Sequence, residues 1–192
     1  MNRLRVGVAL CGSYCTYEKT MKVVQRLATE YDVTPIMSEN ASVTDSRFGE
    51  AKYFRAMLEE CTGKKVIDSI TLAEPIGPKA LLDVLIIIPC TGNTIAKLAN
   101  GVTDSSVTMA AKAHLRNGRP VVIAVSTNDG LSGNAKNIGE LLNKKNIYFV
   151  PFYQDDPQKK PCSLVADFNQ VEKTVEAAME GKQLQPILET CE

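Results

Sequence analysis

Two strand-like segments, DVLIII at residues 83–88 and PVVIAV at residues 120–125, constrain the fold of this chain most strongly. Both are apolar almost throughout and rich in β-branched residues, which is typical of strands that helices cover on both faces of a parallel sheet. Predicted helices alternate with the strands, and they are Thr16–Tyr31, Ser46–Cys61, Asn93–Asn100, Asp104–Asn117, Asn134–Lys145 and Asn169–Glu180. The alternation predicts an α/β fold: a doubly wound parallel sheet with helices on both faces, in three layers.

Three further strands are expected, LRVGVAL at 4–10, DVTPIM at 32–37 and IYFVPF at 147–152, and KVIDSI at 65–70 could be a short one. The polar segment QDDPQKKPCS at 154–163 carries two prolines, which predicts a loop or flap. A final helix over 169–181 ends at a glycine. Since no linker or repeat interrupts the sequence, we expect a single domain over residues 1–192.

Charge and cysteine content exclude several classes of protein. The chain has 22 basic and 22 acidic residues, so no basic excess points to nucleic acid. No apolar run is long enough to cross a bilayer, and the apolar part of the N-terminus is too short for a signal peptide, so we expect a cytoplasmic protein. We expect free thiols at the six cysteines and no metal site, because the chain has a single histidine, His114. His114 lies near a helix end, which suits a structural histidine that is cationic or partly solvated.

Polar residues gather where four of the predicted strands end, at Cys11–Tyr14, Ser38–Asn40, Pro89–Thr94 and Ser126–Gly130. Helix capping explains any one of these turns, because Ser, Thr and Asn are common N-cap residues. The carboxyl ends of parallel strands lie at one edge of the sheet, however, and ligands of such folds bind there. Several converging turns therefore favour a ligand site, and helix N-termini suit a phosphate.

The kind of ligand is narrowed by two motifs that the chain lacks. The first turn, CGSYCTY, has one glycine and does not match the G-x-G-x-x-G dinucleotide fingerprint, and no Walker A motif is present. A mononucleotide is therefore expected in preference to NAD or ATP.

Four segments in matching order, VGVALCGSYCTYEKT, PIMSENA, DVLIIIPCTGNTIAKLANGVTDS and VVIAVSTNDGLSGNAKNIGELLNKKNIYFVPF, resemble the homo-oligomeric flavin-containing Cys decarboxylase superfamily. This superfamily includes phosphopantothenoylcysteine decarboxylase and the flavin prenyltransferases. The resemblance implies a Rossmann-like flavoprotein fold that binds FMN. By position it implies cofactor contacts from Gly12, Ser13, Tyr14, Ser38, Pro89, Thr91, Gly92, Asn93, Thr94, Ser126 and Thr127. It also leaves two roles open for Cys90, a small residue under the flavin or a thiol that forms an adduct with it.

Two departures separate the chain from the decarboxylases. Pro75 stands where they carry a histidine, and their P-x-M-N-x-x-M clamp becomes VSTNDGL at 125–131, in which only Asn128 is kept. Within the superfamily, AEPIGPKALLDVLIIIPCTGNT and STNDGLSGNAKNI are most similar to the family of dipicolinate synthase B subunits from spore-forming bacteria. Asn128 and Arg55 are then the candidate catalytic residues for a substrate with two carboxylates, and Lys159 and Lys160 of the flap are further candidates for its recognition.

This resemblance implies an oxidoreductase subunit that helps form dipicolinate from a dihydro- or hydroxytetrahydro-dipicolinate precursor. It implies a partner, the A subunit of dipicolinate synthase, that would hold NADP. It also implies a trimer-based homo-oligomer that can extend to a dodecamer, and the mother-cell cytoplasm of a sporulating bacterium as location. Two alternatives stay open. The chain could be an FMN-dependent decarboxylase or flavin prenyltransferase, or a non-catalytic flavin-binding scaffold.

Overall fold

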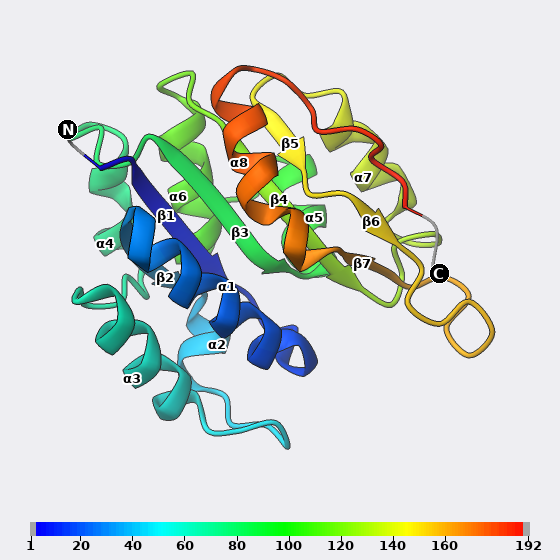
Figure 1. Cartoon of the computed structure of the whole chain (residues 1–192), viewed down its shortest axis with the longest axis horizontal. Coiled ribbons are helices and arrows are strands. Elements are labelled where there is room, and N and C mark those ends of the chain that lie inside the picture. The colour runs from blue at the N-terminus through cyan, green and yellow to red at the C-terminus, as the bar shows by residue number, and fades with distance from the viewer. Residues whose placement is uncertain (1–2, 190–192) are drawn as a thin grey trace.

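The computed structural model describes residues 3–189 and is built around a parallel sheet (Figure 1). Its parallel strands are β1 Arg5–Leu10, β2 Asp32–Met37, β3 Val84–Cys90, β4 Val121–Thr127 and β5 Ile147–Phe149. They are ordered β2-β1-β3-β4-β5. All seven residues of β3 are buried, as the continuous apolar run predicts. The order reverses between β1 and β3, which makes the crevice at their carboxyl ends the topological switch point.

The edge of the sheet beyond β4 is antiparallel, which the sequence did not predict. The segment IYFVPF forms two strands, β5 and β6 Phe152–Tyr153, and an unpredicted strand, β7 Leu164–Ala166, runs antiparallel to both β4 and β6. Residues 154–163 connect β6 to β7, so the predicted flap is the connection of a short hairpin. The expectation of a wholly parallel sheet is therefore wrong at this edge.

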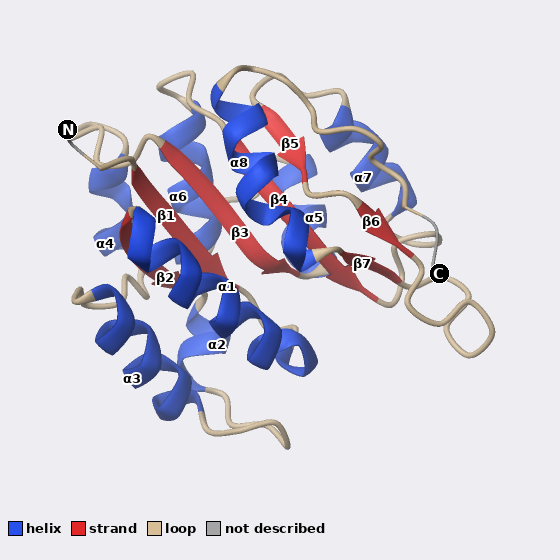
Figure 2. Ribbon diagram, viewed as in Figure 1, coloured by secondary structure: helices blue, strands red, loops and turns tan. Residues whose placement is uncertain are grey.

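Helices cover both faces of the sheet, which confirms the predicted layers (Figure 2). Helices α1 Tyr17–Glu30 and α8 Val171–Met179 contact one face, whereas α5 Gly92–Ala99, α6 Ser106–Leu115 and α7 Ala135–Leu142 contact the other. The remaining helices are α2 Glu39–Val43, α3 Ala51–Thr62 and α4 Ile70–Ala73, with 3₁₀ turns at Tyr14–Thr16, Glu74–Ile76 and Phe168–Gln170. None of the helices in residues 3–189 is both long and apolar enough to cross a membrane.

Two further predicted elements differ in the structure. Helix α3 begins at Ala51 and not at Ser46, because Ser46 and Gly49 close a turn through their backbones and the Asp45 carboxylate accepts the Ala51 N–H at 2.8 Å. The candidate strand at 65–70 is reduced to one bridge between Ile67 and Ile36. Ile67 exchanges backbone hydrogen bonds with Pro35 and Met37 at the edge of the sheet, and the pairing then stops because Ser69 begins α4 as its N-cap.

The interpretation of His114 as structural fits the structure, but the expected cationic or solvated state is wrong. His114 on α6 is 1% exposed, and its Nε2 lies 3.0 Å from the carbonyl oxygen of Pro120. Burial lowers the pKa of the imidazole to about 4, although the hydrogen bond to Pro120 opposes the shift. The ring is therefore neutral at pH 7. The chain leading into β4 covers it and keeps water away from the imidazole.

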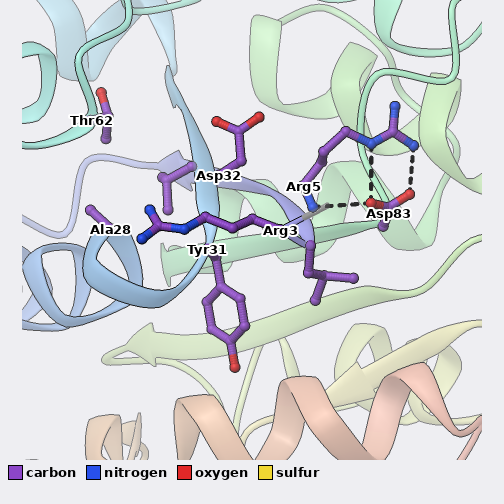
Figure 3. Close-up of a pocket in the computed structure, with 9 residues that line it drawn as sticks. Arg3, Arg5, Ala28, Tyr31, Asp32, Thr62 and Asp83 are labelled. Atoms are coloured by element: carbon purple, nitrogen blue, oxygen red, sulfur yellow. Dashed lines mark hydrogen bonds and ion pairs between the residues drawn. The ribbon is translucent and has the colours of Figure 1, made fainter. Parts of the chain in front are cut away.

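An ion-pair cluster holds together the opposite edge of the sheet, at the amino ends of β1 and β3 (Figure 3). Arg5 donates to both carboxylate oxygens of Asp83, at 3.1 Å from Nε and 2.6 Å from Nη2, and Arg119 lies 3.3 Å from the same carboxylate. The hydrogen bonds from Arg5 lower the pKa of Asp83. Arg5 and Asp83 border an 870 Å³ cavity, but each neutralises the charge of the other in the ion pair.

Asp83→Asn should destabilise the chain by about 1–2 kcal/mol at pH 7, because hydrogen bonds to a charged group are lost. The pKa of Asp83 is lower in the folded state, so the ion pair stabilises at neutral pH and its contribution is lost as the pH falls below about 4. Urea unfolding at pH 7 and pH 3.5 measures both effects. Glu180→Gln, which breaks the exposed pair with Lys182, is the control and should leave stability unchanged. Equal midpoints for wild type and Asp83→Asn at pH 7 would contradict this role.

Candidate functional site

The carboxyl ends of β1, β3 and β4 border two adjoining cavities, which we name the first lobe and the second lobe. The first lobe, 430 Å³, lies between the turns after β1, β2 and β3, and the second lobe, 440 Å³, lies between the turns after β1, β3 and β4 and the flap. Gly12, Thr91 and Asn93 line both. The two lobes therefore form one depression at the switch point, the place where folds of this topology bind ligands.

The turns after β1, β3 and β4 are joined by direct hydrogen bonds. The Cys11 N–H donates to the Pro89 carbonyl at 3.3 Å, and the hydroxyls of Ser13 and Ser126 lie 2.8 Å apart. The convergence of these turns that the sequence predicted is therefore present. Pro89 contributes through its backbone, as it is buried in β3 and lines neither lobe.

Thr91 and Thr94 fix the beginning of α5. Thr91 accepts the Thr94 N–H at 3.3 Å as the N-cap, and the Thr94 hydroxyl donates to the Cys11 sulfur at 3.2 Å. Burial raises the pKa of the Cys11 thiol to about 11, so the sulfur is an uncharged acceptor. Thr94 is 6% exposed, and its hydroxyl is engaged within the chain. Its part in the site is to hold α5 against β1.

Gly92 fits into a cluster of polar side chains from the turn after β4. A Cβ at this position would lie 2.5 Å from Asn134 Nδ2, 2.6 Å from Asp129 Oδ1 and 2.6 Å from Thr127 Oγ1. The Asp129 carboxylate joins the cluster by accepting hydrogen bonds from Thr127 and, at 2.8 Å, from Asn134. Only glycine therefore allows the start of α5 to approach this turn so closely. Asp129 lies within the predicted polar turn Ser126–Gly130, but neither it nor Asn134 was named as a cofactor-binding or catalytic residue.

The turn after β2 and the far end of α5 complete the first lobe. Ser38 caps α2 by accepting the Ala41 N–H at 3.3 Å, and the Tyr14 hydroxyl donates to the Asn40 carbonyl at 3.4 Å. Lys97 also lines this lobe, and its ammonium group pairs with Asp104 at 2.9 Å. Sequence reasoning missed Lys97, although its spacing of three residues from Thr94 places both on one helix face.

Several polar groups at the depression remain available to a ligand. The backbone N–H groups of Gly12, Gly92 and Asn93 have no acceptor among residues 3–189, and the Asn128 side-chain amide has no partner there either. Unpaired N–H groups at the start of a helix suit an anion, and the hydroxyls beside them suit a phosphate or a sugar alcohol. The residues present thus fit a flavin mononucleotide, with lobes large enough for a small-molecule ligand.

Two other candidate residues, Arg55 and Cys90, line neither lobe. Arg55 on α3 pairs with Asp68 and lines neither lobe, so within one chain the structure does not bring it to Asn128. Cys90 is fully buried in β3, and burial raises the pKa of its thiol well above the usual value. The structure therefore favours the small packed residue over a reactive thiol. Cys191 lies outside the described residues.

Comparison with known proteins gives consistent matches. The Flavoprotein family model matches residues 1–180. The B subunit of dipicolinate synthase from Bacillus subtilis is 49% identical over 185 residues, which are 96% of this chain and 92% of that protein. The crystal structure of the same kind of subunit from Bacillus halodurans is 46% identical, has a TM-score of 0.90 and covers 99% of both chains. The resemblance inferred from the sequence is confirmed.

A more distant structure shares the fold alone. AnUbiX, in complex with FMN and dimethylallyl pyrophosphate, is 21% identical with a TM-score of 0.62 over 78% of each chain.

Proposed function

This chain belongs to the Flavoprotein family, and from that membership we propose that it is the FMN-binding subunit of a dipicolinate synthase. The activity is suggested by the name of its relatives in Bacillus subtilis and Bacillus halodurans. The reaction would convert a dihydro- or hydroxytetrahydro-dipicolinate into pyridine-2,6-dicarboxylate. The observation that carries the flavin site is the group of unpartnered N–H donors at the β1/β3 switch point, on Gly12, Gly92 and Asn93.

We propose that the first lobe holds the phosphate end of the cofactor. Gly12 and Asn93, whose N–H groups have no acceptor among residues 3–189, line this lobe, and Lys97 is the only cation among the described residues that line it. Ser38 and Tyr14 would contact the ribityl chain, while Ser13, Ser126 and Thr127 would contact the ring system from the second lobe. A bound flavin would supply the hydride acceptor for an aromatisation.

The chain's own residues would then bind and orient the substrate in the second lobe. The Asn128 amide is free to donate to a carboxylate or a ring nitrogen. Arg55 remains a candidate only if a second copy of the chain brings it to this lobe. We propose that the protein acts in the mother-cell cytoplasm as a trimer-based homo-oligomer. Its partner would be the A subunit of the synthase, which would hold NADP.

The test has two stages. First, FMN titrated into the purified chain should lose fluorescence saturably and raise the melting temperature, and riboflavin should bind about ten-fold more weakly because it lacks the phosphate. Secondly, dipicolinate formation from its precursor should require the FMN-loaded chain together with the partner. Turnover that proceeds at the same rate with the FMN-free chain, or with the partner by itself, would leave this chain a scaffold. A chain that binds neither flavin would overturn the proposal.

A further inference from the structure

Residues 154–163 connect β6 to β7 as a loop (Figure 1). Three residues of this loop, Asp155, Lys160 and Ser163, line the second lobe. Within the loop, the Lys160 N–H donates to the Asp156 carbonyl at 2.7 Å and the Ser163 N–H donates to the Lys160 carbonyl at 3.0 Å. The Leu131 N–H donates to the Cys162 carbonyl at 3.0 Å, which joins the loop to the turn that carries Asn128. These bonds fix where the loop's side chains lie relative to that turn.

The two neighbouring lysines of this loop are in different positions. Lys160 lines the second lobe, and its ammonium group lies 2.9 Å from Asp155 Oδ2. The other Asp155 oxygen accepts the Ser163 hydroxyl at 2.6 Å, and Ser163 is buried. Asp155 therefore holds Lys160 at the mouth of the lobe. Lys159 is exposed and lines neither lobe.

The ammonium group of Lys160 keeps donors for a ligand. It has three N–H donors, of which the structure engages one with Asp155, and the side chain is 49% exposed. The Asn128 amide lines the same lobe and has no partner among residues 3–189. The two donors therefore line one cavity, on two loops that the hydrogen bond between Leu131 and Cys162 joins.

We propose that Lys160 and Asn128 form a carboxylate-binding subsite of the second lobe, in which Asp155 is a positioning residue. The inference rests on the proposed function, which makes the substrate a dicarboxylate, and deepens it by assigning the contacts. It assigns selectivity to Lys160 and excludes Lys159, although the two lysines carry the same charge and are adjacent in sequence.

Two carboxylates and one ammonium group line the second lobe, and both carboxylates are engaged within the chain. Asp129 directs its two oxygens to Thr127 and Asn134, and Asp155 directs its oxygens to Lys160 and Ser163. Both carboxylates therefore have donors within the chain. Because Lys160 is the only cation among the described residues that line this lobe, its removal takes away the one fixed positive charge that they provide.

The experiment measures binding of pyridine-2,6-dicarboxylate to the FMN-loaded full chain by calorimetry, with pyridine-2-carboxylate as the probe that lacks one carboxylate. Lys160→Ala should weaken dicarboxylate binding about ten-fold, and Lys160→Arg should restore most of it. Lys159→Ala, the matched control of equal charge change, should bind within about two-fold of wild type. Flavin affinity and melting temperature should be the same in all variants, because Lys160 is half exposed.

The results separate this inference from the function beneath it. If wild type binds the dicarboxylate and Lys160→Ala binds it equally well, the subsite is wrong and the proposed function stands. If both alanine variants weaken binding alike, the loop acts only through its general charge, and the assignment to Lys160 is overturned. If FMN-loaded wild type binds no dicarboxylate, the proposed substrate fails, and the inference fails with it.

Discussion

Gly92→Ala is expected to lower the affinity for FMN at least about 100-fold while the chain still folds. The added Cβ would lie within 2.6 Å of three polar atoms, on Thr127, Asp129 and Asn134. These atoms cannot all withdraw without breaking the hydrogen bonds that Asp129 accepts from the other two. The start of α5 must therefore move away from the turn after β4, and overpacking of this kind costs about 1–3 kcal/mol.

The loss of affinity follows from where that movement occurs. The free N–H groups of Gly92 and Asn93 are at the start of α5, and their aim at the depression depends on the position of this helix end. A small displacement removes several donors from a phosphate at once. Fluorescence titration with FMN measures the change, and the far-ultraviolet circular dichroism and melting curve show whether the variant is folded.

Gly139→Ala is the matched control for this substitution. Gly139 lies on the exposed face of α7, and a Cβ there would meet nothing within 4 Å. Because glycine inside a helix is unfavourable, this variant should bind FMN as wild type does and gain about 0.5–1 kcal/mol of stability. Wild-type FMN affinity in Gly92→Ala would show that the close approach of α5 to the turn does not matter for the site.

The parts of the fold that could be predicted are those whose signal lies within one segment. Continuous apolar runs identified β3 and β4, and the polar turns after β1, β2, β3 and β4 identified the edge at which the site lies. Strand β7 was missed because it has three residues and follows the polar flap. Its pairing with Ser126 and Thr127 is a tertiary contact that no local periodicity records.

The site residues follow the same division. Gly12, Thr91 and Asn93 were predicted, because their turns carry a recognisable polar pattern, and they line both lobes. Lys97 and Asp129 were not, since a lysine on a helix and an aspartate in a turn are common surface residues until the fold places them. The structure also distinguishes Lys160 from Lys159, which the sequence treats alike.

His114 should make the folded chain lose stability as the pH falls from about 6.5 to about 4. In the unfolded chain its imidazole binds a proton near pH 6.5, whereas burial lowers its pKa to about 4 in the folded chain. Between these values the unfolded state binds the extra proton, so acidification favours unfolding. The total loss is about 3 kcal/mol, reached near pH 4, and the contribution of His114 to stability is fully present above about pH 7.

His114→Gln separates this effect from those of other titrating groups, because glutamine has an N–H donor for the Pro120 carbonyl but no proton to gain. Urea unfolding of both proteins at pH 7.0, 6.0, 5.0 and 4.5 gives the two stability curves. We expect the wild-type curve to fall more steeply, so that the variant, less stable than wild type at pH 7 because the ring's packing is lost, approaches or overtakes it at pH 4.5. Parallel curves would mean that His114 gains its proton at the same pH in the folded and the unfolded chain. Its environment under β4 would then be far more polar than its 1% exposure implies.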